Sequence, residues 1–240
     1  YLQSDVDPVG LDSIIQLINS NEFGKISVFS LNHDTVLEKA LDKANIKFCD
    51  GFGDWEYNVR WFKPSLYDDS NANRLFKLHG SINWQSLQSS KYSGIGIARW
   101  GDNIEPLSPS DRQRLHTGQH PIILSGTYNK ESRYYFDIIA DMHWRFFQIL
   151  RDQNTRLIII AGYGWNDRSI NGRLREWIWN KEENRFLFIY KNPESTKKSK
   201  STLWSDFDKL IERCKLYLIS KWPRDIENDE LENAVRRACQ

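Results

Sequence analysis

One hydrophobic run, RLIIIA at 156–161, constrains the fold more than any other feature of this sequence. Its apolar side chains do not alternate with polar ones, which is typical of a parallel strand that is buried on both faces. The turn GYGWND follows at 162–167, and then apolar residues recur at helical spacing, at Ile170, Leu174 and Trp177. A strand, a glycine turn and a helix in this order are the repeating unit of parallel α/β sheets.

The same alternation of strands and helices continues along the chain. Strands are predicted at 25–31, 74–78, 121–124, 185–190 and 215–219, and helices at 12–19, 35–44, 136–150, 203–211 and 229–239. We therefore expect an α/β fold, with a Rossmann-like, mainly parallel sheet and helices on both of its faces. A single domain is predicted over 1–240. The aromatic stretch 49–73 is predicted to be a hairpin or loop that covers the core, and the polar stretch at about 85–120 a small insertion or cover.

The composition is that of an ordinary globular protein and excludes several classes of function. Of the 240 residues, 40% are hydrophobic and 27% charged, and the net charge of +1 gives no electrostatic basis for binding nucleic acid or a membrane surface. The longest apolar run is too short to span a bilayer, so a cytoplasmic location is predicted. The three cysteines, Cys49, Cys214 and Cys239, contain no C-x-x-C pair, and no metal site is predicted.

Two polar residues lie where the first predicted strand ends. Asn32 and Asp34 precede a helix start, since Thr35 and Glu38 have the spacing of a capping box. Ligands of open α/β sheets bind at this end of the strands. The alternative is that Asn32 and Asp34 only satisfy backbone groups of a turn. His33 is predicted to point elsewhere, because successive side chains diverge at a strand end.

A histidine follows the predicted strand at 74–78, whose polar and apolar residues alternate as in a half-buried strand. Gly80 allows the backbone to turn sharply after His79 and to approach a ligand closely. An imidazole there can accept a proton from a hydroxyl or a water. The alternative is a loop histidine packed against Trp84.

A second group of candidate residues lies further along the chain. Gly162 and Gly164 form a G-x-G turn between a strand and a helix N-terminus, an arrangement that cradles nucleotide phosphates or ribose. Asn192 follows the strand at 185–190, where a polar side chain is placed to bind a ribose hydroxyl.

Taken in order, four motifs resemble the sirtuin family, and more closely the sirtuin-like domains of bacterial antiviral defence proteins. They are LNHD at 31–34, KLHGS at 77–81, GYGWND at 162–167 and YKNP at 190–193, and the resemblance spans about 25–192. It implies that Asn32, Asp34 and His79 are catalytic and that NAD is the substrate. The residues that it assigns to binding the adenosine side of NAD are Gly162, Tyr163, Gly164 and Asn192.

The resemblance further implies an NAD⁺ glycohydrolase that depletes NAD in abortive infection, as a homo-oligomer or with a partner such as an ATPase or an Argonaute-like protein. The zinc-binding cysteine quartet of sirtuin deacylases is absent, which disfavours deacylation. The family's glycine-rich first strand and turn precede the Asn–Asp motif, and we expect them upstream of Tyr1, since the only methionine is Met142.

A rival hypothesis is a non-catalytic module that binds NAD or ADP-ribose and assembles with a partner. Trp165, Trp177 and Trp179 could supply its interface, although core packing explains them equally well. A nuclease is disfavoured, because the sequence has no carboxylate cluster for a metal ion.

Overall fold

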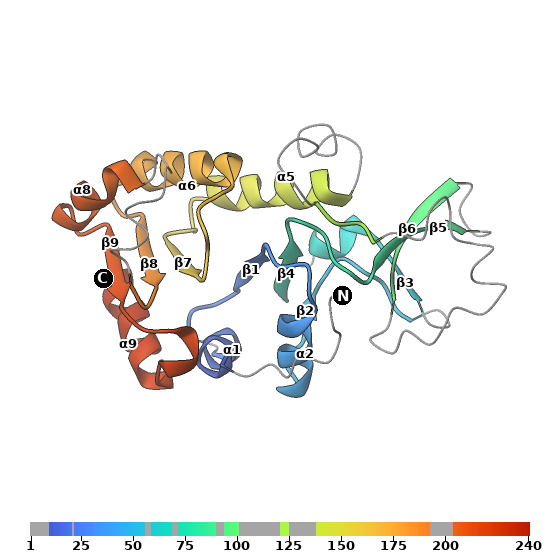
Figure 1. Cartoon of the computed structure of the whole chain (residues 1–240), viewed down its shortest axis with the longest axis horizontal. Coiled ribbons are helices and arrows are strands. Elements are labelled where there is room, and N and C mark those ends of the chain that lie inside the picture. The colour runs from blue at the N-terminus through green and yellow to red at the C-terminus, as the bar shows by residue number, and fades with distance from the viewer. Residues whose placement is uncertain are drawn as a thin grey trace. The chain divides into compact units, whose positions relative to one another are not determined.

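The computed structural model describes residues 10–20, 22–55, 59–68, 72–89, 94–100, 121–124, 138–192 and 204–240 (Figure 1). The chain divides into two compact units. The first unit consists of Tyr1–Pro8 and Ser20–Trp144, and the second of Val9–Asn19 and Arg145–Gln240. Each unit has its own three-stranded parallel sheet. The single domain predicted over 1–240 stays a prediction.

The parallel sheet of the first unit has the strand order β1-β4-β2. Its elements are β1 (Ser27–Ser30), β2 (Phe48–Cys49) and β4 (Asn73–Lys77), and helix α2 (Val36–Lys43) follows β1. Ser27 pairs with Arg74 and Ser30 with Lys77, so β1 and β4 end at the same edge (Figure 1). The alternation predicted for β4 is wrong, because Leu75, Phe76 and Lys77 are all buried.

A second, antiparallel sheet in the first unit has the order β3-β6-β5. Its strands are β3 (Val59–Trp61), β5 (Trp84–Ser89) and β6 (Gly94–Trp100). The part of the predicted insertion or cover from residue 85 to residue 100 therefore contains most of β5 and all of β6, which pair with each other along their length. Backbone pairing rather than an apolar pattern defines these strands, and the residues from 101 to 120 lie outside the described part of the chain.

Two further expectations in the first unit concern connecting segments. The stretch 49–73 contains β3 and the 3₁₀ helix η1 (Pro64–Asp68), and the buried Tyr67 hydroxyl lies 2.6 Å from the carbonyl oxygen of Asp50. The described residues of this segment therefore pack against the core, as predicted, and they include a short strand and a 3₁₀ helix. The strand predicted at 121–124 is reduced to one bridge between Ile123 and Gly80.

The parallel sheet of the second unit has the order β7-β8-β9. Its strands are β7 (Leu157–Ala161), β8 (Arg185–Ile189) and β9 (Leu216–Ile219). Burial on both faces was predicted for β7, and this prediction is wrong. It is instead β8 that is buried on both faces, since Phe186 to Ile189 are all buried. The reason is strand order: β8 lies between two strands, whereas β7 is at the edge of this sheet as described and is mostly half-buried.

The helices largely follow the apolar periodicity of the sequence. They are α1 (Asp12–Asn19), α5 (Ile138–Arg151), α6 (Arg168–Asn180), α8 (Phe207–Glu212) and α9 (Asn228–Cys239), with the 3₁₀ helices η2 (Trp204–Asp206) and η3 (Pro223–Asp225). Residues 136 and 137 of the helix predicted at 136–150 lie outside the described residues. Parallel strands connected by helices confirm the predicted α/β, Rossmann-like fold class. Across the described ranges, every helix is too short or too polar to cross a membrane.

Candidate functional site

Two loops meet at the carboxyl ends of β1 and β4. Because these strands are parallel neighbours, the segment after β1 lies beside the turn after β4. The backbone N–H of Leu78 donates to the carbonyl of Ser30 at 2.9 Å, and that of Ile82 donates to the carbonyl of His33, also at 2.9 Å. The hydroxyl of Ser81 lies 3.3 Å from the same His33 carbonyl. The sheet thus fixes the two predicted catalytic segments against each other.

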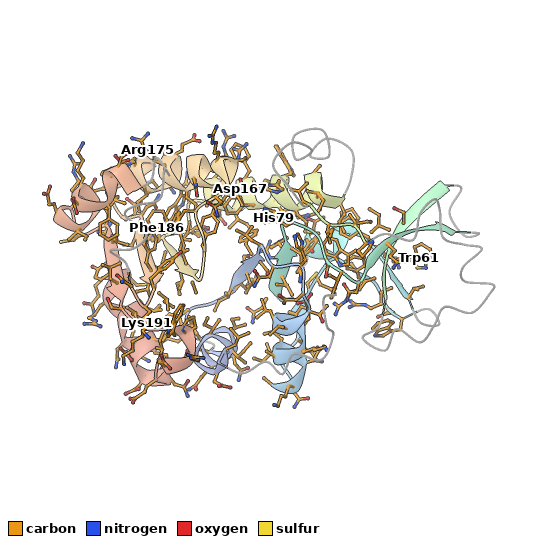
Figure 2. The ribbon with its side chains drawn as sticks, viewed as in Figure 1. Trp61, His79, Asp167, Arg175, Phe186 and Lys191 are labelled. Carbon is orange, nitrogen blue, oxygen red and sulfur yellow. The ribbon has the colours of Figure 1, made fainter. Side chains whose placement is uncertain are left out.

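His79 lies in this turn, just after β4 (Figure 2), and its side chain is half-buried. The next residue, Gly80, has φ +77°, and a Cβ there would collide with the carbonyl oxygen of Ile122. The close approach predicted for Gly80 is therefore made to the protein's own backbone. Leu124 N–H donates to the His79 carbonyl at 2.8 Å, which fixes the turn further. The ring of Trp84 is buried against Phe52, with the ring centroids 5.4 Å apart.

His33 faces His79, which corrects the prediction that it points elsewhere. Their ring centroids are 6.0 Å apart with an interplanar angle of 34°. Burial lowers the pKa of His33, the neighbouring His79 lowers it further, and Lys77 contributes a smaller effect in the same direction. The carbonyls of Gly80 and His79 oppose this shift. Because its carbonyl is fixed by the turn, His33 cannot follow the simple alternation of an extended strand.

Asn32 and Asp34 lie in the segment between β1 and α2. The side chain of Asn32 is exposed, and its backbone N–H donates to the hydroxyl of Ser30 at 3.2 Å. One carboxylate oxygen of Asp34 accepts a hydrogen bond from Val36 N–H at 3.1 Å. Asp34 therefore fills the turn role that the sequence left open as an alternative, and this contact also orients its carboxylate.

The predicted capping box is wrong, and its glutamate has a different partner. Thr35 makes no side-chain capping bond, and Glu38 is buried with one carboxylate oxygen 3.2 Å from Nζ of Lys77. Lys77 Nζ also donates to the carbonyl oxygen of Asp34. Desolvation lowers the pKa of Lys77, and the nearby Glu38 opposes this shift. Lys77 thus links β4 to both α2 and the loop before α2. The sequence did not predict this role, because a lysine in an alternating strand is expected to face solvent.

The second group of predicted residues lies in the second unit. Gly162 is exposed with φ +63°, and a Cβ there would have no heavy atom within 4 Å. Gly164 is also exposed. The Tyr163 hydroxyl is 2.8 Å from Oδ1 of Asn171, so this ring is held by α6. Asn192 is exposed after β8. The structure thus leaves open space beside Gly162, although the proposed contacts with NAD stay predictions.

The N-terminus of α6 contains an internal carboxylate. Asp167, at the beginning of α6 in Figure 2, accepts hydrogen bonds from Ser169 N–H at 3.0 Å and Ile170 N–H at 3.2 Å. Amides of this kind would otherwise attract a phosphate. These two amides are therefore already occupied by Asp167. Of the predicted phosphate- or ribose-binding cradle, the glycine turn remains.

The tryptophans of this region are explained mainly by packing. Trp165 is buried against Phe188, with ring centroids 5.2 Å apart, and Trp177 is buried against Phe186 at 5.4 Å. These contacts weaken the suggestion that the two rings form an interface. In the described ranges, no three His, Cys, Asp or Glu side chains gather as a metal site would require.

Comparison with known families agrees with these motifs. A family model described as the SIR2-like domain matches residues 26–211, a range that includes the segments after β1, β4, β7 and β8. A search of curated proteins finds no match. A SIR2-like domain is compatible with NAD-dependent activity and with NAD as a substrate. Because the match covers most of the chain, this protein belongs to the SIR2-like domain family.

Proposed function

We propose that this protein is an NAD⁺ glycohydrolase, which cleaves the bond between nicotinamide and ribose to give nicotinamide and ADP-ribose. The observation that supports this most directly is the placement of His79. In a SIR2-like chain, the half-buried His79 ring lies on a turn that is hydrogen-bonded to the loop carrying Asn32 and Asp34.

The three residues have complementary roles in this reaction. Positive charge develops on the ribose as the glycosidic bond breaks, and the oriented carboxylate of Asp34 stabilises it. The exposed amide of Asn32 holds the nicotinamide carboxamide and so restricts its orientation. His79 accepts a proton from a ribose hydroxyl or from the attacking water, the commonest task of histidine in catalysis.

Two observations fit the binding of NAD. Among the described residues, the buried Nδ1 of His33 has no hydrogen-bond partner, and Gly162 has open space where a Cβ would lie. We further propose that Gly162, Tyr163, Gly164 and Asn192 contact the adenosine side of NAD. This assignment rests on the resemblance of their motifs to the family.

The wider biological role is also part of the proposal. NAD depletion in antiphage abortive infection, assembly as an oligomer or with an ATPase or Argonaute-like partner, and a cytoplasmic location all rest on the resemblance to defence proteins. The rival, a non-catalytic NAD-binding module, loses part of its support because Trp165 and Trp177 are buried in the core.

The test is nicotinamide release from NAD⁺ by the whole chain, measured by chromatography with and without candidate phage activators. His79→Ala should lower the rate by about a hundredfold or more, since general acid–base catalysis contributes that much, and Asn32→Ala should also lower it. His143→Gln is the matched control, because His143 is a half-buried histidine whose Nε2 lies 3.1 Å from the Leu78 carbonyl, and glutamine can retain that contact. No release under any condition, with NAD still bound, would refute the hydrolase and favour the binding module.

A further inference from the structure

The backbone carbonyls of His33 and of the residue after it are both held by hydrogen bonds. Its carbonyl accepts hydrogen bonds from Ile82 N–H at 2.9 Å and from the Ser81 hydroxyl at 3.3 Å. The carbonyl of the next residue, Asp34, accepts from the buried Lys77. These contacts fix the backbone position from which the His33 ring extends to the side of His79.

The ring itself is incompletely satisfied. Its Nδ1 atom is buried and has no hydrogen-bond partner in the part of the chain that the structure describes, while the side chain as a whole is half-buried. Buried polar atoms in folded proteins nearly always have a partner, and leaving one without is destabilising. A ligand group that supplies this hydrogen bond, after a rotation of the ring exposes Nδ1, would remove the penalty.

The surroundings of the ring determine which ligand groups suit it. The charged or titratable groups that act on it are His79 and Lys77, and the carbonyls of His79 and Gly80 also face it. Burial and these two side chains lower the pKa of His33, so the ring is neutral at neutral pH. A neutral imidazole has one donor and one acceptor, which suits an uncharged hydroxyl or amide better than a phosphate.

We infer that His33 is a substrate-binding residue that hydrogen-bonds an uncharged hydroxyl or amide of the nicotinamide–ribose half of NAD. This inference rests on the proposed function, because it takes NAD as the substrate. It adds a fourth residue to the set of Asn32, Asp34 and His79. The amide of nicotinamide and the hydroxyls of the ribose are both uncharged groups that can hydrogen-bond a neutral imidazole. Binding experiments with separate fragments of NAD distinguish them.

Two substitutions in the whole chain test this contact. His33→Leu keeps much of the volume but removes both ring nitrogens, whereas the amide of His33→Asn reaches about as far as Nδ1 and can still hydrogen-bond. Each variant is titrated by calorimetry with nicotinamide, which has the amide but no ribose, and with ADP-ribose, which has the hydroxyls but no amide. We expect His33→Leu to weaken one of these ligands by roughly 5- to 100-fold, and His33→Asn to restore most of that loss.

The His33 ring signal gives an independent readout in the unmutated protein, which remains informative if His33→Leu fails to fold. The ring Cε1–H signal, assigned by triple-resonance NMR, should shift with the same fragment whose affinity falls in His33→Leu. His143→Gln serves as the control and should bind both fragments as the parent does. Equal binding by the parent and His33→Leu, or an unshifted His33 signal with both fragments, would overturn the inference.

The outcomes also separate this inference from the proposed function. Release of nicotinamide by the parent together with His33-independent fragment binding would leave the hydrolase standing and refute the contact. Absence of nicotinamide release together with His33-dependent binding would refute the hydrolase and support the contact.

Discussion

The buried ion pair of Lys77 and Glu38 allows a quantitative test of how the site is held in place. The side chains are 3% and 4% exposed, and Nζ lies 3.2 Å from a carboxylate oxygen. Lys77→Met removes the cation while filling a similar volume. The substitution leaves the Glu38 carboxylate buried without its cation, and its other oxygen, Oε2, already lacks a hydrogen-bond partner among the described residues.

The expected loss is large relative to the stability of a typical domain. Coulomb's law gives about 5 kcal/mol for two unit charges at this separation with an effective dielectric constant of about 20. Removing one partner of a buried ion pair typically lowers the stability of a protein by about 3–5 kcal/mol. We therefore expect Lys77→Met to lower the free energy of unfolding of the first unit by about 3–5 kcal/mol.

The double variant Lys77→Met/Glu38→Leu should be more stable than Lys77→Met alone. It removes both charges, and replacing a buried pair by apolar side chains of similar volume is often neutral. The contact of Nζ with the Asp34 carbonyl is lost in both variants, so neither should recover full activity even where folding is restored.

Hydrogen exchange at increasing urea concentration is the appropriate assay, followed on a peptide that covers β4. Tryptophan fluorescence would mix the two compact units, because the chain contains 10 tryptophans. The four proteins of the cycle are the parent, the two single variants and the double variant. If the losses of the single variants add to within about 0.5 kcal/mol, the two side chains are independent and the argument fails.

Two further predictions concern backbone strain and pH. Gly80→Ala should destabilise the protein by at least about 1 kcal/mol more than Gly24→Ala in thermal or urea unfolding. Both residues have positive φ, but only at Gly80 would a Cβ collide with a neighbouring carbonyl, and equal losses would contradict this account. Stability should also fall as the pH drops below about 6.5, because the unfolded chain then binds a proton that the folded His33, with its lowered pKa, does not. The fall should stop below the folded pKa, and His33→Asn should show a smaller loss between pH 7 and pH 5; an equal loss in the two proteins would refute the assignment to His33.

Local sequence patterns predicted most of the regular elements in both units. Strands β1, β7, β8 and β9 are rich in β-branched or aromatic residues, and α1, α5, α6 and α9 have apolar residues at helical spacing. The ordered motifs also indicated the family, which the match over 26–211 confirms. These features were accessible because each depends on residues that are close together in the chain.

Other features depend on strand order and partners distant in sequence. Strands β5 and β6 are defined by pairing with each other, while β5 is mostly polar and β6 contains two glycines. The sequence assigned burial on both faces to β7, but β8 occupies the centre of its sheet. The local sequence of a strand does not reveal whether both of its faces are buried, because this depends on the strands and helices beside it.

By itself, the sequence determined the α/β class, most element positions and the presence of Asn32, Asp34 and His79 at the ends of strands. Only the tertiary structure decided that Glu38 pairs with Lys77 rather than capping a helix, and that His33 faces His79. The physical reason is that β1 and β4 pair in parallel, which brings together groups such as the His33 carbonyl and the Ser81 hydroxyl, 48 positions apart in the chain.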